Sequence, residues 1–184
     1  VGYEALYYQT GDNNTAFGYQ AAKASNGSAA ANVAVGHQAL TANTTAQHNV
    51  AVGASAMVAN TTGHSSTGIG SNALLTQTTG HNNTAVGFNA MRLTETGNGR
   101  NVAIGHGALY TQTTGYQNTA VGHSSMYSLT TGYMNTAMGE AAGNAMTTGI
   151  ENAFFGFSAG KLNTTGSGCT ALGAYALDAN TTAA

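Results

Sequence analysis

The chain has 184 residues, of which 42% are hydrophobic and 5% are charged, with a formal net charge of −2. Four Lys and Arg residues against six Asp and Glu residues exclude the basic surface that binds nucleic acid and the polybasic segment that binds a membrane surface. No apolar run is long enough for a transmembrane helix, so membrane insertion is not expected.

A glycine recurs at nearly constant spacing along the whole chain. It closes the motif Asn-Thr-Ala-Val-Gly, as at residues 83–87, and the period is 17 residues with single-residue slips. The glycines are Gly2, Gly18, Gly36, Gly53, Gly70, Gly87, Gly105, Gly122, Gly139, Gly156 and Gly173. A short fixed period indicates a repeat architecture. We expect a single repeat domain over residues 1–184 and, because both ends lie inside a repeat, a segment of a longer fibrous protein.

Each repeat predicts one short strand before its central glycine. The residue preceding the glycine is always large and apolar, as Val86 and Ile104 are, and the residue two positions earlier is usually Thr or Val. Strand side chains alternate between two faces, so both columns are expected to point into the core. Proline, which would remove a donor from the ladder, is absent. The pattern predicts an all-β, parallel β-solenoid of about ten to eleven coils.

Alternation then places the residue between these two columns on the outside. That residue is almost always alanine, although water would tolerate charged residues there, so the column is predicted to pack against another chain. The predicted subunit interface comprises Ala16, Ala34, Ala51, Ala85, Ala103, Ala120, Ala137 and Ala171. Phe154 is the exception in this column and is expected to fill a local gap or to disturb the contact.

Three further columns complete the unit. A second apolar segment such as Ala39-Leu40 is expected to form the opposite wall, and an asparagine column that includes Asn118 is expected to form a hydrogen-bonded corner ladder. The glycine of the recurrent Thr-Thr-Gly is expected to supply a positive φ for the return turn. Residues 142–143 and 159–160 read Ala-Gly in place of Ala-Leu, so the core should thin there unless Phe154, Phe155 and Phe157 compensate. A bulge or short loop is expected over residues 23–31.

The pattern Asn-[Thr/Val]-Ala-[Val/Ile]-Gly-x-x-Ala-[Leu/Met] resembles the head repeats of trimeric autotransporter adhesins. With Thr-Thr-Gly added, the unit is similar to repeats in bacteriophage tail fibres and related bacterial surface proteins. The resemblance covers essentially the whole chain, although the adhesin period is shorter. It implies a left-handed β-roll, a homotrimer, and a location outside the cell, on its surface or on a virion.

Chemistry-bearing residues are few. The charged residues are scattered, and no pair of carboxylates recurs in adjacent coils as a glycosidase would require, so neither an enzyme nor a cofactor is expected. His106 and His123 share one repeat position, and His64 and His81 share another, with His48 expected to match them one coil earlier. Each histidine pair is a weak metal candidate that lacks enough ligands for zinc on its own.

Exposed aromatic residues beside Asn and Thr are candidates for stacking on cell-surface carbohydrate. The candidates are Tyr3, Tyr19, Phe88, Tyr110 and Tyr127. The sequence therefore favours a non-enzymatic fibrous or adhesive module, a shaft or head, that associates with itself. Two alternatives remain: a subunit of an end-to-end extracellular filament, and an ice-binding solenoid whose threonine columns order water.

Overall fold

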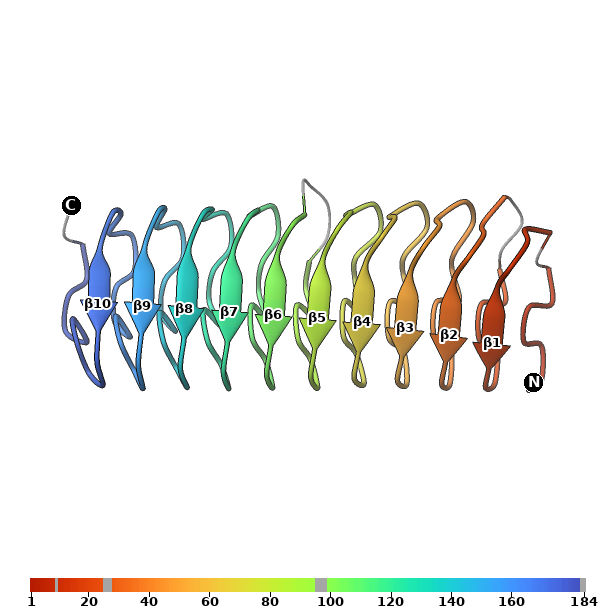
Figure 1. Cartoon of the computed structure of the whole chain (residues 1–184), viewed down its shortest axis with the longest axis horizontal. Helices are drawn as coiled ribbons and strands as arrows, with labels where there is room; N and C mark the ends of the chain where they lie inside the picture. The colour runs from red at the N-terminus through yellow and green to blue at the C-terminus, as the bar shows by residue number, and fades with distance from the viewer. Residues whose placement is uncertain (9, 25–27, 95–98, 183–184) are drawn as a thin grey trace.

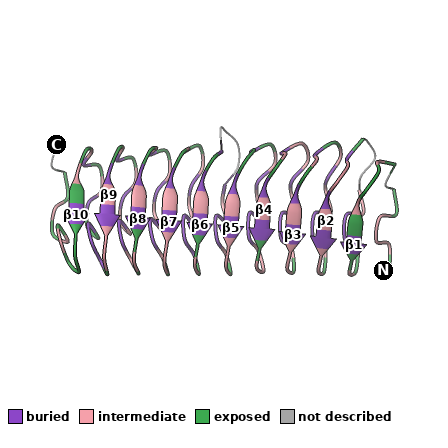
Figure 2. Cartoon of the chain, viewed as in Figure 1, coloured by how far each residue is buried: buried purple, intermediate pink, exposed green. Residues whose placement is uncertain are grey.

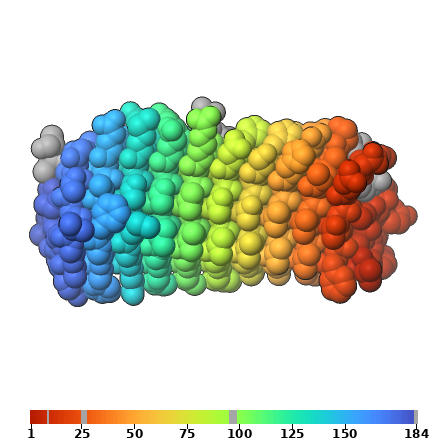
Figure 3. Space-filling view, in the orientation of Figure 1, coloured from red at the N-terminus to blue at the C-terminus, as the bar shows by residue number. Residues whose placement is uncertain are grey.

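The computed structural model describes residues 1–8, 10–24, 28–94 and 99–182, and within them ten three-residue strands form one parallel sheet in chain order (Figure 1). The strands are β1 Thr15–Phe17, β2 Val33–Val35, β3 Val50–Val52, β4 Thr67–Ile69, β5 Thr84–Val86, β6 Val102–Ile104, β7 Thr119–Val121, β8 Thr136–Met138, β9 Ala153–Phe155 and β10 Thr170–Leu172. Equivalent residues pair from coil to coil, as Ala85 does with Ala103. The predicted parallel β-solenoid is confirmed, and the coils lie side by side along a rod (Figure 3). Within the loop expected over residues 23–31, residues 25–27 lie outside the described part of the chain.

The strand side chains point in directions opposite to those predicted. In every strand the middle residue is buried, whereas its two neighbours are partly or largely exposed (Figure 2). Ile104, for example, is 41% exposed, but Ala103 beside it is fully buried. The predicted subunit interface is therefore wrong, because the alanine side chains line the core of their own chain: Ala16, Ala34, Ala51, Ala85, Ala103, Ala120, Ala137 and Ala171.

The narrowness of the coil explains this reversal. A Cβ added to Gly68, the middle residue of β4, would lie 3.0 Å from Cγ of Met57 on the opposite wall. The space between the walls thus holds one long side chain and one methyl group. Since Leu and Met already extend from the opposite wall, a second large column from the sheet would overpack the core, and the large residues of the sheet face outward.

The opposite wall consists of turns rather than a second strand. Leu40, Met57, Leu74 and Met91 are fully buried on it, as predicted for the second apolar segment. Each has a positive φ, between 48° and 54°. Their amides still bond from coil to coil: Leu40 N–H donates to Ala56 O at 3.0 Å. This wall supplies most of the apolar volume of the core.

The predicted asparagine corner ladder is confirmed. The Asn118 side chain is fully buried, and its Oδ1 accepts the Asn135 N–H at 3.0 Å while its Nδ2 donates to Gly132 O at 2.9 Å. Asn118 N–H in turn donates to Asn101 Oδ1 at 3.0 Å. Each amide therefore satisfies backbone groups that the turn leaves without partners, which buried backbone requires.

Two glycine columns keep the coils close together. The central Gly87 has φ of 136°, and a Cβ there would lie 2.5 Å from Gly105 O in the next coil. The Thr-Thr-Gly glycines differ from the prediction, because Gly80 does not have a positive φ. Instead, a Cβ on Gly80 would lie 3.0 Å from Gln77 Oε1 and 3.2 Å from Asn83 Nδ2. Glycine is used there to make room for the buried amides.

Candidate functional site

Exposed rings form columns along the rod because each coil repeats the same position directly above the last. In the column that follows the central glycine, Tyr3 stacks on Tyr19 with ring centroids 5.5 Å apart, and Tyr19 stacks on His37 at 5.2 Å. Farther along, Phe88 stacks on His106 at 5.3 Å, and His106 on His123 at 5.0 Å. Five of the predicted aromatic and histidine candidates thus lie in one column: Tyr3, Tyr19, Phe88, His106 and His123.

A second column pairs Tyr110 with Tyr127 at 4.7 Å. The Arg92 guanidinium lies 5.7 Å from the Tyr110 ring centre and donates from Nη1 to the Tyr110 hydroxyl at 2.7 Å. The Arg92 guanidinium is therefore held beside the Tyr110 ring of its own column.

The third column follows Thr-Thr-Gly. His64 and His81 stack at 5.3 Å, and Tyr116 and Tyr133 stack at 4.8 Å. The tyrosine pair was not predicted, although both residues follow Thr-Thr-Gly as the two histidines do. His48 does not match this position: it has a positive φ of 59°, as the residue after His64 does, so Gln47 is the equivalent residue.

The histidines of this column serve the backbone. His64 Nδ1 accepts the Gln47 N–H at 3.0 Å, and His81 Nδ1 accepts the His64 N–H at 2.9 Å. The pKa of His64 lies below its usual value, first because of burial and then because of the nearby His81 and His48 charges. The neutral ring is the form that can accept at Nδ1, so the hydrogen bond and the lowered pKa agree.

The histidine pairs do not converge on one point as metal ligands would. His106 and His123 lie face to face, with Glu140 Oε1 4.0 Å from His123 Nδ1. In the His64–His81 pair, Nδ1 of each ring already accepts a backbone N–H. Among the residues that the structure describes, no three His, Cys, Asp or Glu side chains come close enough to hold a metal ion.

The stacking also limits how the aromatic candidates could hold a sugar. A sugar packs its apolar face on the face of a ring, but within a stack each ring face is covered by its neighbour. Tyr19, between Tyr3 and His37, has neither face available. Faces remain only where a stack ends, which makes the ends of the columns the places to look for ligand contact.

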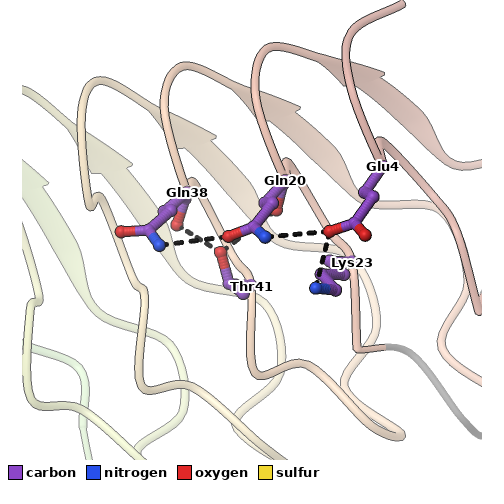
Figure 4. A network of polar contacts seen from close by, with 5 residues as sticks. All are labelled: Glu4, Gln20, Lys23, Gln38 and Thr41. Atoms are coloured by element: carbon purple, nitrogen blue, oxygen red, sulfur yellow. Dashed lines mark hydrogen bonds and ion pairs between the residues drawn. The ribbon is translucent and has the colours of Figure 1, made fainter.

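A row of polar side chains joins neighbouring coils near the N-terminus (Figure 4). Gln38 Nε2 donates to Gln20 Oε1 at 3.2 Å, and Gln20 Nε2 donates to Glu4 Oε2 at 2.8 Å. Lys23 pairs with the same Glu4 oxygen at 2.6 Å. The Lys23 and Gln20 hydrogen bonds lower the pKa of the Glu4 carboxyl. These contacts join neighbouring coils at the surface and leave Lys23 engaged.

In the described part of the chain, no helix is long and apolar enough to cross a membrane. Comparison with known protein families, with curated proteins and with solved structures finds no match for this chain. A proposal about function therefore has to start from the surface of the solenoid itself.

Proposed function

We propose that this chain is a non-enzymatic fibrous module, the shaft or head of a bacteriophage tail fibre or a bacterial surface adhesin, and that it works as a homotrimer. The observation that carries the proposal is the outward face of the sheet. The last residue of each strand forms one column of this face, which is entirely apolar from Phe17 to Leu172. The first residue of each strand forms the other column, which consists of Thr and Val except for Ala153 in β9. Phe17, Ile69, Ile104 and Met138 are exposed in the apolar column.

The size of this face supports an interface. At about 4.8 Å per strand and about 3.3 Å per residue, ten three-residue strands cover roughly 480 Å². This area includes the Thr and Val column as well as the apolar column, and it is comparable with the largest apolar patches on monomeric proteins, which often have a binding role. Because the same kind of residue recurs at every coil, the face of a second copy matches it along its whole length. Copies arranged around an axis would close a ring of such contacts.

The resemblance to trimeric adhesin and tail-fibre repeats supports three copies. In this arrangement the outward columns, and not the alanines, meet near the axis, and the ring columns remain outside. Carbohydrate contact at the free ends of those columns, as at Tyr3 and Phe88, is part of the proposal. The location would be outside the cell, on its surface or on a virion.

The test is the mass in solution by light scattering, with a subunit mass of 18.4 kDa. We expect about three subunits for the natural chain and one subunit for a Val86→Asp, Val121→Asp variant that keeps its sheet circular dichroism. Thr114→Asp, on an exposed turn away from the face, is the matched control and should stay trimeric. A natural chain that is monomeric at every concentration would sink the proposal. A mass that grows without limit as concentration rises would indicate the filament instead.

An ice-binding solenoid is the second candidate, because one specific observation favours it. Thr67, Thr84, Thr119 and Thr136 lie on the outward face of a flat parallel sheet, in one column. Self-association would cover this column, so the two functions exclude each other. A monomer that shows thermal hysteresis would favour ice binding, and a trimer without hysteresis would remove it.

A further inference from the structure

A break in the third ring column leaves a cavity in the side of the rod. Gly99 holds the position of the ring residue, since Gln117 N–H donates to Gly99 O (3.3 Å) just as Met134 N–H donates to Tyr116 O (3.1 Å). The coil that contains it is one residue longer than the period. The cavity has a volume of about 200 Å³ and is lined by His81, Asn82, Gly99, Arg100, Tyr116 and Gln117.

The backbone at Gly99 leaves no room for a ring, or for any other side chain, at this point of the column. A Cβ on Gly99 would collide with the carbonyl oxygen of His81 and would lie 2.7 Å from Asn83 Oδ1. No other residue fits at this point without moving the preceding coil. The backbone position of Gly99 therefore excludes any side chain that could continue the ring column.

Two ring faces meet across this gap. The far face of His81 is covered by His64, and the far face of Tyr116 is covered by Tyr133. Among the described residues, no ring stacks on the other face of His81 or of Tyr116, and both rings line the same cavity. His81 and Tyr116 are two coils apart, which at about 4.8 Å per coil corresponds to a spacing of roughly 9.6 Å. This spacing leaves room for one inserted ring.

The polar lining adds one cation and two amides. Arg100 is exposed, and none of the carboxylates that the structure describes forms an ion pair with it. Two other described cations are engaged, since Lys23 pairs with Glu4 and Arg92 donates to the Tyr110 hydroxyl. Asn82 and Gln117 stand at the same coil position as Arg100 in the coils before and after it, and all three have a positive φ.

We propose that this cavity binds one pyranose ring that carries a carboxylate, such as a hexuronate unit of a surface polysaccharide. The sugar ring lies between the His81 and Tyr116 faces, the Arg100 guanidinium binds the carboxylate, and the Asn82 and Gln117 amides face the hydroxyls. The site lies at the break within the third ring column, away from Tyr3 and Phe88, and it does not require self-association.

The polar lining favours a sugar over a flat aromatic ring. A flat ring midway between the two faces would lie about 4.8 Å from each, which is the centroid spacing of the Tyr116–Tyr133 stack itself, so distance alone does not select a sugar. The hydroxyls of a pyranose suit the two amides, which a hydrocarbon ring would leave without partners.

The test uses methyl β-D-glucuronide as the probe and methyl β-D-glucoside as its neutral counterpart, with binding followed by ligand-observed NMR titration of the natural chain. We expect weak, saturable binding of the glucuronide and at least about tenfold weaker binding of the glucoside, since a charged hydrogen bond is lost. Arg100→Gln should bring the two sugars to within about twofold of each other. Tyr116→Ala should abolish binding of both.

Tyr127→Ala is the matched control, because it removes a stacked ring from a different column and should leave glucuronide binding unchanged. Each variant is checked by circular dichroism, and for a Tyr116→Ala chain that fails to fold, Arg100→Gln alone carries the test. The proposal is overturned if the natural chain binds neither sugar, if Tyr127→Ala weakens binding as much as Tyr116→Ala, or if benzoate binds more tightly than the glucuronide. Because the mass in solution is measured separately, a failure here leaves the trimer proposal standing.

Discussion

The coils that carry β5 and β9 fill the same narrow core in opposite ways. Around β5 the sheet contributes only the methyl group of Ala85, and the opposite wall contributes Leu74 and Met91. Around β9 the sheet contributes the whole ring of Phe154, and the opposite wall has Gly143 and Gly160 in place of the large residues. A Cβ on Gly143 would lie 3.1 Å from the Phe154 ring, and one on Gly160 would lie 2.7 Å from it.

The two regions show that each coil needs a certain side-chain volume in its core, which either the sheet or the opposite wall can supply. The sequence predicts a gap at residues 142–143 and 159–160 and phenylalanines to compensate for it, and Phe154 does so from the buried side of the sheet. Phe155 and Phe157 do not, because they face outward, and Phe157 is 44% exposed. One ring therefore replaces the side chains missing from two successive coils, which makes this stretch the most dependent on a single residue.

The largest expected effect comes from Phe154→Ala. The opposite wall has no large side chain on either side of this ring, so its removal leaves a large cavity. The free energy of unfolding should therefore fall by about 3–5 kcal/mol. Urea unfolding followed by circular dichroism measures this. Phe157→Ala, outward and partly exposed, is the control and should cost less than about 1 kcal/mol. Equal effects for the two variants would contradict the compensation.

The rescue of Phe154→Ala sharpens the comparison. Gly143 and Gly160 have φ of 59° and 58°, close to the 54° of Leu40 at the equivalent position, so leucine there should adopt a backbone that the other coils already use. We expect Gly143→Leu with Gly160→Leu to recover more than half of the loss in the Phe154→Ala chain. The same two substitutions with Phe154 retained should destabilise the protein through overpacking.

The asparagine ladder crosses both regions without a change, so Asn118→Ala tests what they share. The substitution leaves the Asn135 N–H and the Gly132 carbonyl without their partners. At roughly 1–2 kcal/mol for each of the two unpartnered buried groups, the lower part of the usual range, the loss should be about 2–4 kcal/mol in urea unfolding. Asn118→Ser should cost less, because Ser66, a natural substitute, accepts the Asn83 N–H with its Oγ at 3.2 Å. A serine variant as unstable as the alanine variant would contradict the ladder's role.

The reciprocal experiment moves the β9 arrangement into β5. Ala85→Phe alone should lower the free energy of unfolding by about 1–3 kcal/mol, because Leu74 and Met91 already fill the coil. Adding Leu74→Gly and Met91→Gly should restore part of this loss, which urea unfolding of the three-residue variant measures. If the added glycines lower stability further, the space in the two regions is not equivalent.

Most of the architecture could be predicted from the sequence, and one central feature could not. The period, the parallel register, the opposite wall and the Asn118 ladder all follow from residues that recur in phase. The inward direction of Ala85 does not, because the size of Val86 suggests that the larger residue is the buried one. What decides the direction is the width of the coil, and this depends on Leu and Met residues in a positive-φ backbone that such residues rarely adopt.

The candidate sites show the same division. Pairs at equal repeat positions, such as His106 and His123, stack as their spacing predicts. The cavity beside Gly99 could not be foreseen, since it depends on where the extra residue of one coil shifts the ring column. Only after Gly99 is aligned with His81 and Tyr116 in three dimensions does the gap between two ring faces become visible.

The smallest expected effect tests the width of the coil directly. Gly68 is the one glycine at the middle position of a described strand, and Gly68→Ala restores the residue of its neighbours. Alanine restricts the unfolded chain more than glycine does, which should stabilise the protein by about 0.4–1 kcal/mol. Part of this gain is lost because the new Cβ would lie 3.0 Å from Met57 Cγ, so the Met57 side chain has to move. Met57 is flexible and can shift, so we expect a small net gain in the urea midpoint. Ala85→Gly, the reverse change in the next coil, should lose a similar amount. A lower urea midpoint for Gly68→Ala would mean that the Met57 side chain cannot move away from the new methyl group. The space between the sheet and the opposite wall at β4 would then be too narrow for an alanine.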